Sequence, residues 1–192
     1  AVDEPRAHLA LLSLKEESVP YRVQHPVNRA ILAVALGHRI GLNRSALLDL
    51  GLCALTCDLG MVGLPDDLLE KPGPLTPVER AAVEKHPLYS TLGVLKGGRL
   101  DTSTRRRTLC NFEHHLGFDL GGYPNVLAWD SLHLFSRIIA VCETYDALTS
   151  KRPFREAYGP EIALALMSSE IKYKFDPVLL RVFMKVMAIQ PI

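Results

Sequence analysis

Helix start signals recur along this chain, and they constrain its fold more than any other feature. The sequence TPVE at residues 76–79 forms a capping box with proline at the first helical position. Asp176 is a second capping residue followed by proline, and Asp101 can begin a helix of its own. No segment shows sustained strand alternation, and no internal repeat is evident. The sequence therefore predicts an all-α fold, a bundle of about eight or nine helices.

Apolar residues at helical spacing between these signals predict the individual helices. His25-Pro26 opens one helix that ends at Gly41. Asn43 or Ser45 caps the next, ALLDLGLCALTCDLG, which is so apolar that we expect it to run through the middle of the core. The long helix SLHLFSRIIAVCETYDAL is expected to begin at Asp130 or Ser131. Further helices are predicted over residues 4–17, 76–86, 88–95, 101–115, 160–167 and 178–187, and the buried face of the helix after His25 is predicted at Val27, Ala30, Ile31 and Val34.

Length and composition indicate one compact globular domain, with 192 residues of which 48% are apolar. The formal net charge of +1, with both signs scattered along the chain, gives no electrostatic basis for binding duplex nucleic acid or an anionic membrane. The four cysteines, at positions 53, 57, 110 and 142, do not form a disulfide framework. Neither a signal peptide nor an apolar run of membrane-spanning length is evident, so we expect a cytoplasmic domain without membrane insertion.

Two carboxylates stand in apolar surroundings. Asp58 carries the only full charge in CALTCDLGMVGLP and lies near the C-terminal end of its helix, where the helix dipole repels an anion. A metal or a cationic partner would explain it, and the alternative is an aspartate that forms the turn before Gly60. Glu143 lies near the apolar face of the long helix. Either a metal or a pairing with Arg137 or a neighbouring helix accounts for that carboxylate.

The stretch EHHLGFDLGGYP, residues 113–124, sets two adjacent imidazoles beside a glycine-rich turn. The histidine pair is either an ordinary helix-end pair or a pair of metal ligands. Scattered ligands can converge inside a helix bundle, and imidazoles with a bridging carboxylate suit iron, manganese or zinc. Two such metals form the usual clamp for phosphate-ester hydrolysis. The candidate ligands are His25, Asp58, His86, His114, His115 and Glu143.

Two basic runs have an ordinary interpretation as solvated surface. The triplet at residues 105–107 favours a solvated helix face over a phosphate-binding role. The run SKRPFR at residues 150–155 is typical of a solvated basic turn, although the planar fork of arginine also suits phosphate.

Seven short segments stand in a characteristic order. They are HPVNRA at 25–30, CDLGMVGLP at 57–65, KPGPLTPVE at 71–79, KHP at 85–87, HHLGFDLGGYP at 114–124, RIIAVCETYDALTSKRPFR at 137–155 and FDP at 175–177. In this order they resemble the HD-GYP family of bacterial cyclic di-GMP phosphodiesterases, within the HD metal-phosphohydrolase superfamily. The resemblance implies an all-α, HD-domain-type bundle over residues 21–192, with residues 1–20 as an N-terminal helix and connector.

The resemblance also implies a metal site in two halves that share Asp58. One half keeps its whole ligand set, His86, His114 and His115 with bridging Asp58. The other half consists of His25, position 57, Asp58 and Glu143, and it is altered because Cys57 replaces the histidine of the eponymous pair. Cys57 is either a thiolate ligand or a small, inert core residue.

Further departures from the family pattern bear on the cofactor. Met61 replaces the usual lysine, Glu143 replaces the usual aspartate, and Leu116 replaces a glutamate. Tyr21 stands where members that hold three metals have a carboxylate, which argues against a third metal. The implied cofactor is one or two divalent metals, iron, manganese or zinc, whose ligand preferences overlap.

Contacts with a cyclic dinucleotide are implied on the same grounds. Tyr123 would stack on or bond to the nucleotide, and Lys151, Arg152 and Arg155 would contact its phosphates. The GGYP loop is also a candidate surface for a protein partner.

Three functional interpretations follow. The first is an active metal-dependent phosphodiesterase, centred on Asp58, that opens cyclic di-GMP or a related cyclic dinucleotide. The second is a degenerate domain with weak or no catalysis, which serves cyclic di-GMP signalling as a nucleotide-binding or protein-interaction module. The changes at Cys57 and Met61 favour the second interpretation. Losing a metal ligand weakens metal binding or activity more than changing a residue that only supports a ligand. The third is a purely structural helical domain.

Overall fold

The computed structural model describes residues 19–97, 99–126, 130–152, 155–169 and 172–188. These residues form the α-helices α2 (Tyr21–Arg39), α3 (Arg44–Thr56), α4 (Asp66–Leu69), α5 (Pro77–Val83), α6 (His86–Gly97), α7 (Thr102–Glu113), α8 (Leu134–Thr149), α9 (Pro160–Ser169) and α10 (Pro177–Ala188), and the 3-10 helices η1 (Leu59–Gly63) and η2 (Lys172–Lys174). Over these ranges the only extended pairings are two isolated bridges. The predicted all-α fold is confirmed, whereas the helix predicted over residues 4–17 lies outside the described residues.

The predicted capping residues Asn43, Thr76 and Asp101 begin their helices as expected. The side chain of Asn43 accepts a hydrogen bond from the backbone N–H of Ala46 at 3.0 Å, and that of Asp101 accepts one from Thr104 at 2.8 Å. At α5, Thr76 and Glu79 form the complete capping box. These local signals place helix starts because each satisfies backbone donors that the first turn leaves free.

The start predicted for α2 is wrong, and its predicted buried face is only partly right. The helix begins at Tyr21, so Pro26 lies inside it and His25 is a buried interior residue rather than a helix entrance. Val27 is 48% exposed. Ala30 is buried as predicted, and Ile31 and Val34 are half-buried. The rest of the buried face repeats at helical spacing through His25, Asn28, Arg29, Leu32, Ala33 and Leu36. Polar residues on this face obscured it, because only apolar spacing marks a core face in a sequence.

Helix α8 also begins later than predicted. Its N-cap is His133, whose Nδ1 accepts a hydrogen bond from the backbone N–H of Phe135, rather than Asp130 or Ser131. The His133 backbone N–H donates to the buried carboxylate of Glu113 at 3.0 Å. This contact joins segments 20 residues apart along the chain, and local capping preference cannot anticipate it.

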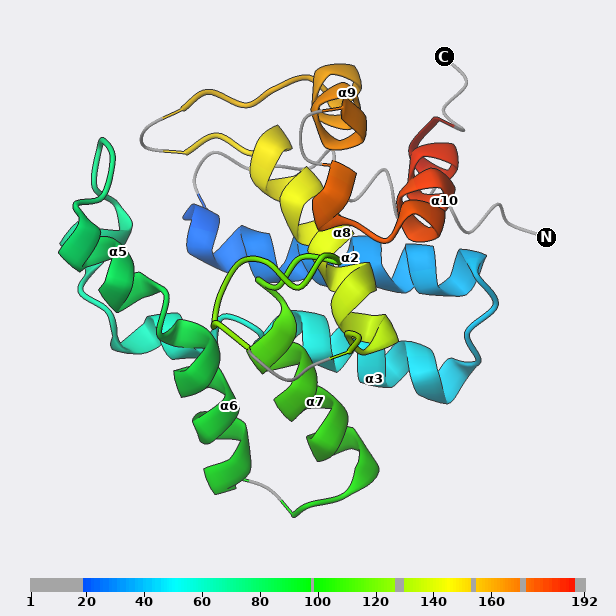
Figure 1. Cartoon of the computed structure of the whole chain (residues 1–192), viewed down its shortest axis with the longest axis horizontal. Helices are drawn as coiled ribbons and strands as arrows, with labels where there is room; N and C mark the ends of the chain where they lie inside the picture. The colour runs from blue at the N-terminus through cyan, green and yellow to red at the C-terminus, as the bar shows by residue number, and fades with distance from the viewer. Residues whose placement is uncertain (1–18, 98, 127–129, 153–154, 170–171, 189–192) are drawn as a thin grey trace.

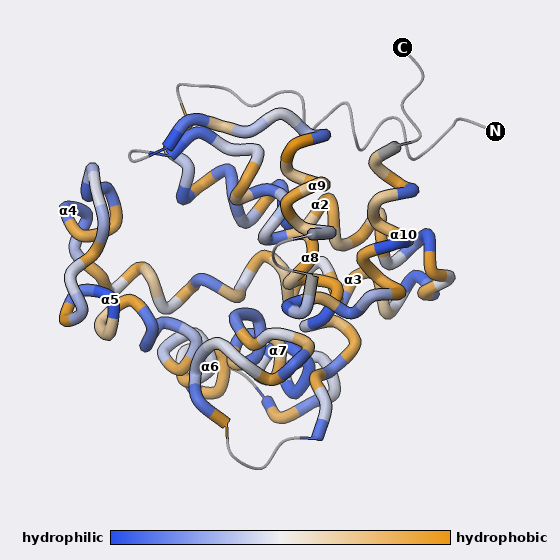
Figure 2. The backbone as a smooth tube through the Cα atoms, turned by 45° about the horizontal axis from the view of Figure 1, so that its top comes forward, coloured by the Kyte–Doolittle hydropathy of each residue, from blue (hydrophilic) through white to orange (hydrophobic). Residues whose placement is uncertain are grey.

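The core gathers around α8, which lies between α2 and the C-terminal helices (Figure 1). Ile138, Ile139, Val141 and Cys142 of α8 are fully buried. Helices α9 and α10, largely apolar in Figure 2, cover one side of α8, and α2 with α3 covers another. Helices α6 and α7 form an antiparallel pair at the edge of this body (Figure 1).

Helix α3 lies on one side of the core rather than through its middle. Leu50, Cys53 and Ala54 are fully buried, but Leu48 is 63% exposed. The prediction failed because apolar content does not reveal how many neighbours surround a helix.

One stretch, Arg44–Gly63, is long and apolar enough to cross a membrane by length and composition alone. It comprises α3 and η1, and its residues Leu50, Cys53, Ala54 and Cys57 belong to the buried core. The same composition therefore also suits a helix packed against a globular body.

The two faces of α3 predict different mutational effects. Leu50→Ala should lower the free energy of unfolding by about 2 to 5 kcal/mol, because it leaves a cavity in the core. Leu48→Ala removes the same atoms from the exposed face and should change that free energy by less than about 0.5 kcal/mol. Urea denaturation of both variants measures the difference, and equal losses would contradict the placement of α3.

Candidate metal centre

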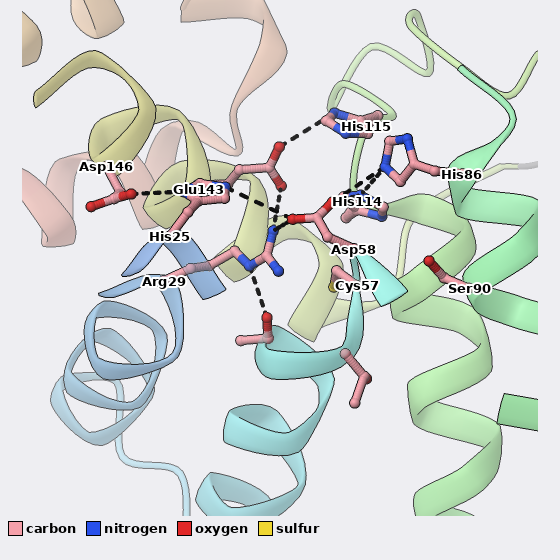
Figure 3. Close-up of polar contacts among 12 residues, drawn as sticks. His25, Arg29, Cys57, Asp58, His86, Ser90, His114, His115, Glu143 and Asp146 are labelled. Atoms are coloured by element: carbon pink, nitrogen blue, oxygen red, sulfur yellow. Dashed lines mark hydrogen bonds and ion pairs between the residues drawn. The ribbon is translucent and has the colours of Figure 1, made fainter. Parts of the chain in front are cut away.

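The ends of several helices converge on one point. Asp58 follows α3 as the N-cap of η1, His86 is the first residue of α6, and His114 and His115 follow α7 directly. Glu143 on α8 and His25 on α2 complete the surroundings (Figure 3). The structure thus brings together all the ligands that the sequence singled out, except Cys57.

Four of these residues form a tight cluster. Asp58, His86, His114 and His115 each offer one ligand atom, and these atoms lie within 4.8 Å of one another. Nε2 of His86 lies 3.0 Å from Nε2 of His114. Oδ1 of Asp58 lies 3.3 Å from the former atom and 3.5 Å from the latter. Ligand atoms about 2.1 Å from one first-row metal lie roughly this far apart, so the spacing fits a metal ion.

The orientation of two imidazoles supports this fit. Nδ1 of His86 donates to the carbonyl of Val83 at 2.8 Å, and Nδ1 of His114 donates to the carbonyl of Asn111 at 2.8 Å. A carbonyl only accepts, so Nδ1 carries the proton and Nε2 of each neutral ring keeps its lone pair. Two lone pairs and a carboxylate oxygen then face one another inside the protein. A cation among them relieves this repulsion, and such backbone support is usual for histidine ligands of metals.

His115 joins the cluster to the GGYP loop. Its Nδ1 lies 3.4 Å from Oε1 of Glu143, and its ring stacks on Tyr123 with centroids 4.5 Å apart. Gly122 has φ +99°, and a Cβ there would lie 2.3 Å from the carbonyl oxygen of His115. Only glycine therefore allows the loop to approach the histidine pair this closely.

Gly60 likewise allows a close backbone contact, here between η1 and α6. A Cβ at this position would lie 2.2 Å from the carbonyl oxygen of His86. The Gly60 backbone N–H donates to Oγ of Ser90 on α6 at 2.7 Å. These contacts hold η1 against α6 and so bring Asp58 to His86. The sequence interpretation did not assign either Gly60 or Ser90 to the site.

The other half of the expected site contains a residue that the sequence interpretation missed. Arg29 is fully buried, and its Nη1 donates to Oδ2 of Asp58 at 2.7 Å. The same atom lies 3.6 Å from Oε2 of Glu143. Arg137, considered as a partner of Glu143, binds Asp176 instead at 2.7 Å. A spacing of four from His25 was the signal that could have placed Arg29 on the same helix face.

His25 is held by a second group of polar residues. Its Nδ1 donates to Oδ2 of Asp146 at 2.6 Å, and Asn28 donates to the other carboxylate oxygen at 2.9 Å. The ring stacks on Tyr21 with centroids 4.8 Å apart. Its Nε2 faces Oδ2 of Asp58 at 3.9 Å, beyond hydrogen-bonding distance.

Cys57 is turned into the core and away from the cluster. Its Sγ donates to the carbonyl of Cys53 at 3.0 Å, and the side chain is fully buried. Burial raises the pKa of the Cys57 thiol well above its ordinary value and outweighs the nearby charge of Arg29. This environment favours the neutral thiol, the form that does not bind metals.

The two carboxylates are ionised despite their burial. Burial opposes the charge of Asp58, but the guanidinium of Arg29 holds the pKa of its carboxyl well below the ordinary value. Burial likewise opposes ionisation of Glu143, while the guanidinium of Arg29 lowers the pKa of its carboxyl below the ordinary value. Both groups are therefore anionic near neutral pH and can bind a cation.

The three basic residues of the loop after α8 lie in different environments. Lys151 is exposed and lies 3.7 Å from Glu156. Arg152 hydrogen-bonds to the hydroxyl of Tyr21, with its guanidinium 4.3 Å from the centre of that ring. The hydrogen bonds of Arg155 go to backbone carbonyls, including Ala147 and Leu148 at the end of α8. Arg152 thus lies beside the half of the site that contains His25, whereas Arg155 completes the C-terminal end of a helix.

Comparison with known proteins gives consistent matches. The family described as HD domain matches residues 10–179. The chain is 34% identical over 193 residues to cyclic di-GMP phosphodiesterase PA4108 of Pseudomonas aeruginosa, covering 98% of this chain and 44% of that protein. It is 32% identical over 146 residues to the cyclic di-GMP phosphodiesterase response regulator RpfG of Xanthomonas campestris, covering 76% and 38%. It is 30% identical over 158 residues to 3'3'-cGAMP-specific phosphodiesterase 3 of Vibrio cholerae, covering 82% and 34%. The chain thus spans less than half the length of these relatives.

Two solved structures share the fold. Bd1817, an HDG"Y"P protein from Bdellovibrio bacteriovorus, superposes with a TM-score of 0.69 at 18% identity, covering 85% of this chain and 51% of that one. The cyclic GMP-AMP-specific phosphodiesterase V-cGAP3 of Vibrio cholerae gives a TM-score of 0.54 at 25% identity, covering 90% and 38%.

The cluster geometry predicts which substitutions affect metal binding. His114→Ala should weaken binding of Mn²⁺ by at least about 100-fold, since losing a ligand exceeds the usual effect of losing a supporting group. Cys57→Ala should leave the affinity unchanged, because its thiol points into the core. Calorimetric titration with Mn²⁺ measures both affinities. A large loss in Cys57→Ala would place the thiol at the metal.

Alanine substitutions at a loop glycine and at a helix glycine should change the stability of the chain in opposite directions. Gly122→Ala should lower the free energy of unfolding by roughly 1 to 3 kcal/mol, since it combines positive φ with a clash at His115. Gly93 lies within α6 with nothing within 4 Å of a Cβ, so Gly93→Ala should raise stability by about 0.5 to 1 kcal/mol. Thermal or urea unfolding of both variants checks the difference in sign.

Proposed function

This chain belongs to the HD domain family, in its HD-GYP branch, and from that premise we propose that it is a cyclic-dinucleotide-binding domain of bacterial signalling with a reduced metal site and weak or no hydrolysis. The observation that carries this proposal is the direction of Cys57, whose Sγ bonds to the carbonyl of Cys53. The half of the site built on position 57 therefore lacks a ligand. Met61 stands where the family usually has a lysine, so the site also lacks that positive charge. This second change likewise favours weak or no hydrolysis.

The ligand class follows from the relatives and from the side chains around the cluster. PA4108 and RpfG are named as cyclic di-GMP phosphodiesterases, and a third relative is named for 3'3'-cGAMP. Beside the cluster, the phenol ring of Tyr123 lies on His115, where a nucleotide base can stack. Lys151 is the exposed cation of the adjacent basic loop, and Arg152 lies against Tyr21. These groups would bind the base and the phosphates of a cyclic dinucleotide.

The metal would be held by the four-residue cluster. Asp58 supplies Oδ1, and His86 and His114 supply Nε2 atoms that backbone carbonyls already orient. When bound there, iron, manganese or zinc supplies Lewis acidity toward a phosphate oxygen. Because His86 and His114 are fully buried, the ligand would approach from the side of Asp58, His115 and Tyr123, which remain partly exposed.

An active phosphodiesterase is the second candidate, and one observation favours it. The cluster contains all four candidate ligands expected for one half of the metal site. The backbone carbonyls of Val83 and Asn111 also fix the histidine tautomers that metal binding needs. In this case Asp58 would be essential for turnover, because it belongs to the cluster and bonds to Arg29 in the other half.

One assay separates the two candidates. With Mn²⁺ or Fe²⁺ added, we expect the wild-type chain to bind cyclic di-GMP and to hydrolyse it far more slowly than PA4108 measured in parallel. Any residual turnover should disappear in Asp58→Asn. Turnover comparable to PA4108 would establish the active phosphodiesterase, and a chain that neither binds nor hydrolyses the nucleotide would leave only a protein-interaction role.

The nucleotide contacts have their own test. Tyr123→Ala should weaken cyclic di-GMP binding by about 5- to 150-fold, the equivalent of about 1 to 3 kcal/mol for loss of one stacked base. Lys151→Ala should weaken binding less, and the effect should shrink at high salt because that side chain is exposed. Lys185→Ala on α10 is the matched control and should have no effect. Unchanged binding in Tyr123→Ala would remove the GGYP loop from the nucleotide site.

A further inference from the structure

Arg29 lies where the second half of the metal site requires a cation. We propose that the Arg29 guanidinium replaces one divalent metal, so that each chain holds a single metal ion in the Asp58, His86, His114 and His115 cluster. The inference rests on the proposed function, because it assumes that this cluster binds metal. It goes further by assigning one metal ion to each chain. It also explains why the half of the site that contains His25 and Cys57 needs no metal.

The two oxygens of Asp58 face different partners. Oδ1 is directed at the Nε2 atoms of His86 and His114, at 3.3 and 3.5 Å. Oδ2 accepts a hydrogen bond from Nη1 of Arg29 at 2.7 Å (Figure 3). One oxygen is thus free for a metal, and the other is already compensated by a fixed positive charge. A carboxylate that bridges two metals with one oxygen on each would instead have both oxygens directed at metal ions.

The same guanidinium reaches the other carboxylate of this half. Nη1 of Arg29 lies 3.6 Å from Oε2 of Glu143, a buried atom without a hydrogen-bond partner among the described residues. Nη2 of Arg29 is also buried, and in the part of the chain that the structure describes it has no hydrogen-bond partner. Arg29 therefore stands between the two carboxylates that would hold the second metal. An arginine cannot lose its proton in a protein, so the positive charge is permanent.

Arg29 is fixed in this position by the helix on the other side. Its side chain is fully buried, and its Nε donates to the carbonyl of Ala54 near the C-terminal end of α3 at 2.8 Å. That end of a helix carries partial negative charge and so favours a cation. The guanidinium is held between α2, α3 and α8, and it has no solvent into which it can withdraw when a second metal approaches.

His25 is hydrogen-bonded through Nδ1 as metal-binding histidines usually are, but its Nε2 faces a position that Arg29 already occupies. Asp146 fixes its Nδ1, and Nε2 points toward Oδ2 of Asp58 at 3.9 Å. That oxygen is the one occupied by Arg29. A divalent ion bound between His25 and Asp58 would face the guanidinium at close range, and the like charges would repel. His25 is therefore outside the metal shell of this chain.

The test is the number of metal ions bound per chain. After equilibrium dialysis against Mn²⁺, elemental analysis should give one Mn²⁺ per wild-type chain, and electron paramagnetic resonance should give the signal of an isolated ion. Arg29→Met removes the charge at similar length and should allow a second Mn²⁺ to bind, with loss of the isolated-ion signal through magnetic coupling. Arg29→Lys keeps the positive charge and should remain at one.

Two further variants keep the inference testable if Arg29→Met does not fold. His25→Ala should still bind one Mn²⁺ with wild-type affinity, whereas His114→Ala should bind none. Two Mn²⁺ ions in the wild-type chain, or loss of binding in His25→Ala, would overturn the role of Arg29 and leave the proposed function intact. A wild-type chain that binds no metal would overturn this inference together with the metal site of the proposed function, whereas the cyclic di-GMP binding assay tests nucleotide binding separately.

Discussion

The negative charge of Asp58 is the constraint on which the site depends. The carboxylate stands at the end of an apolar helix, next to the negative end of the helix dipole, where an unpaired anion is unfavourable. The chain compensates it at Oδ2 with the guanidinium of Arg29, and at Oδ1 it places the candidate metal ligands His86 and His114, which with Asp58 can hold a cation. Each of these groups comes from a different helix end or helix face. The position of one aspartate therefore dictates how α2, α6 and α7 must be placed around α3.

Backbone geometry makes this convergence attainable. The candidate ligands Asp58, His86, His114 and His115 lie at or next to helix ends, where a side chain can reach a common point without passing another turn of helix. Glycine at positions 60 and 122 lets η1 and the GGYP loop approach the backbone of His86 and His115 at distances that exclude a Cβ. Backbone carbonyls at Val83 and Asn111 then fix the imidazole tautomers. Small residues and main-chain groups thus determine the site as much as the ligands do.

Local signals in the sequence were sufficient for the fold class and for several helix starts, but not for features set by distant contacts. Asn43, Thr76 and Asp101 cap their own helices, so a short window contains all the information. The start of α8 depends on Glu113, which lies 20 residues away along the chain. The candidate ligands were identified from motifs, whereas Arg29 was missed because a single arginine in an amphipathic helix usually lies on its solvated face. The direction of Cys57 is decided by packing, which residue identity alone does not give.

A permanent cation and a metal ion are not chemically equivalent at this position. A guanidinium neutralises neighbouring carboxylates and can donate hydrogen bonds to a phosphate, so binding of an anionic nucleotide is compatible with Arg29. It offers no open coordination position and cannot activate a water molecule, which a two-metal clamp does while also stabilising the leaving oxygen. Replacing one metal by arginine would therefore preserve the charge balance on which the folded site relies, while removing much of its hydrolytic capacity. On this reasoning, stability and nucleotide binding can persist in such a chain after turnover has declined, because they depend on charge rather than on coordination chemistry.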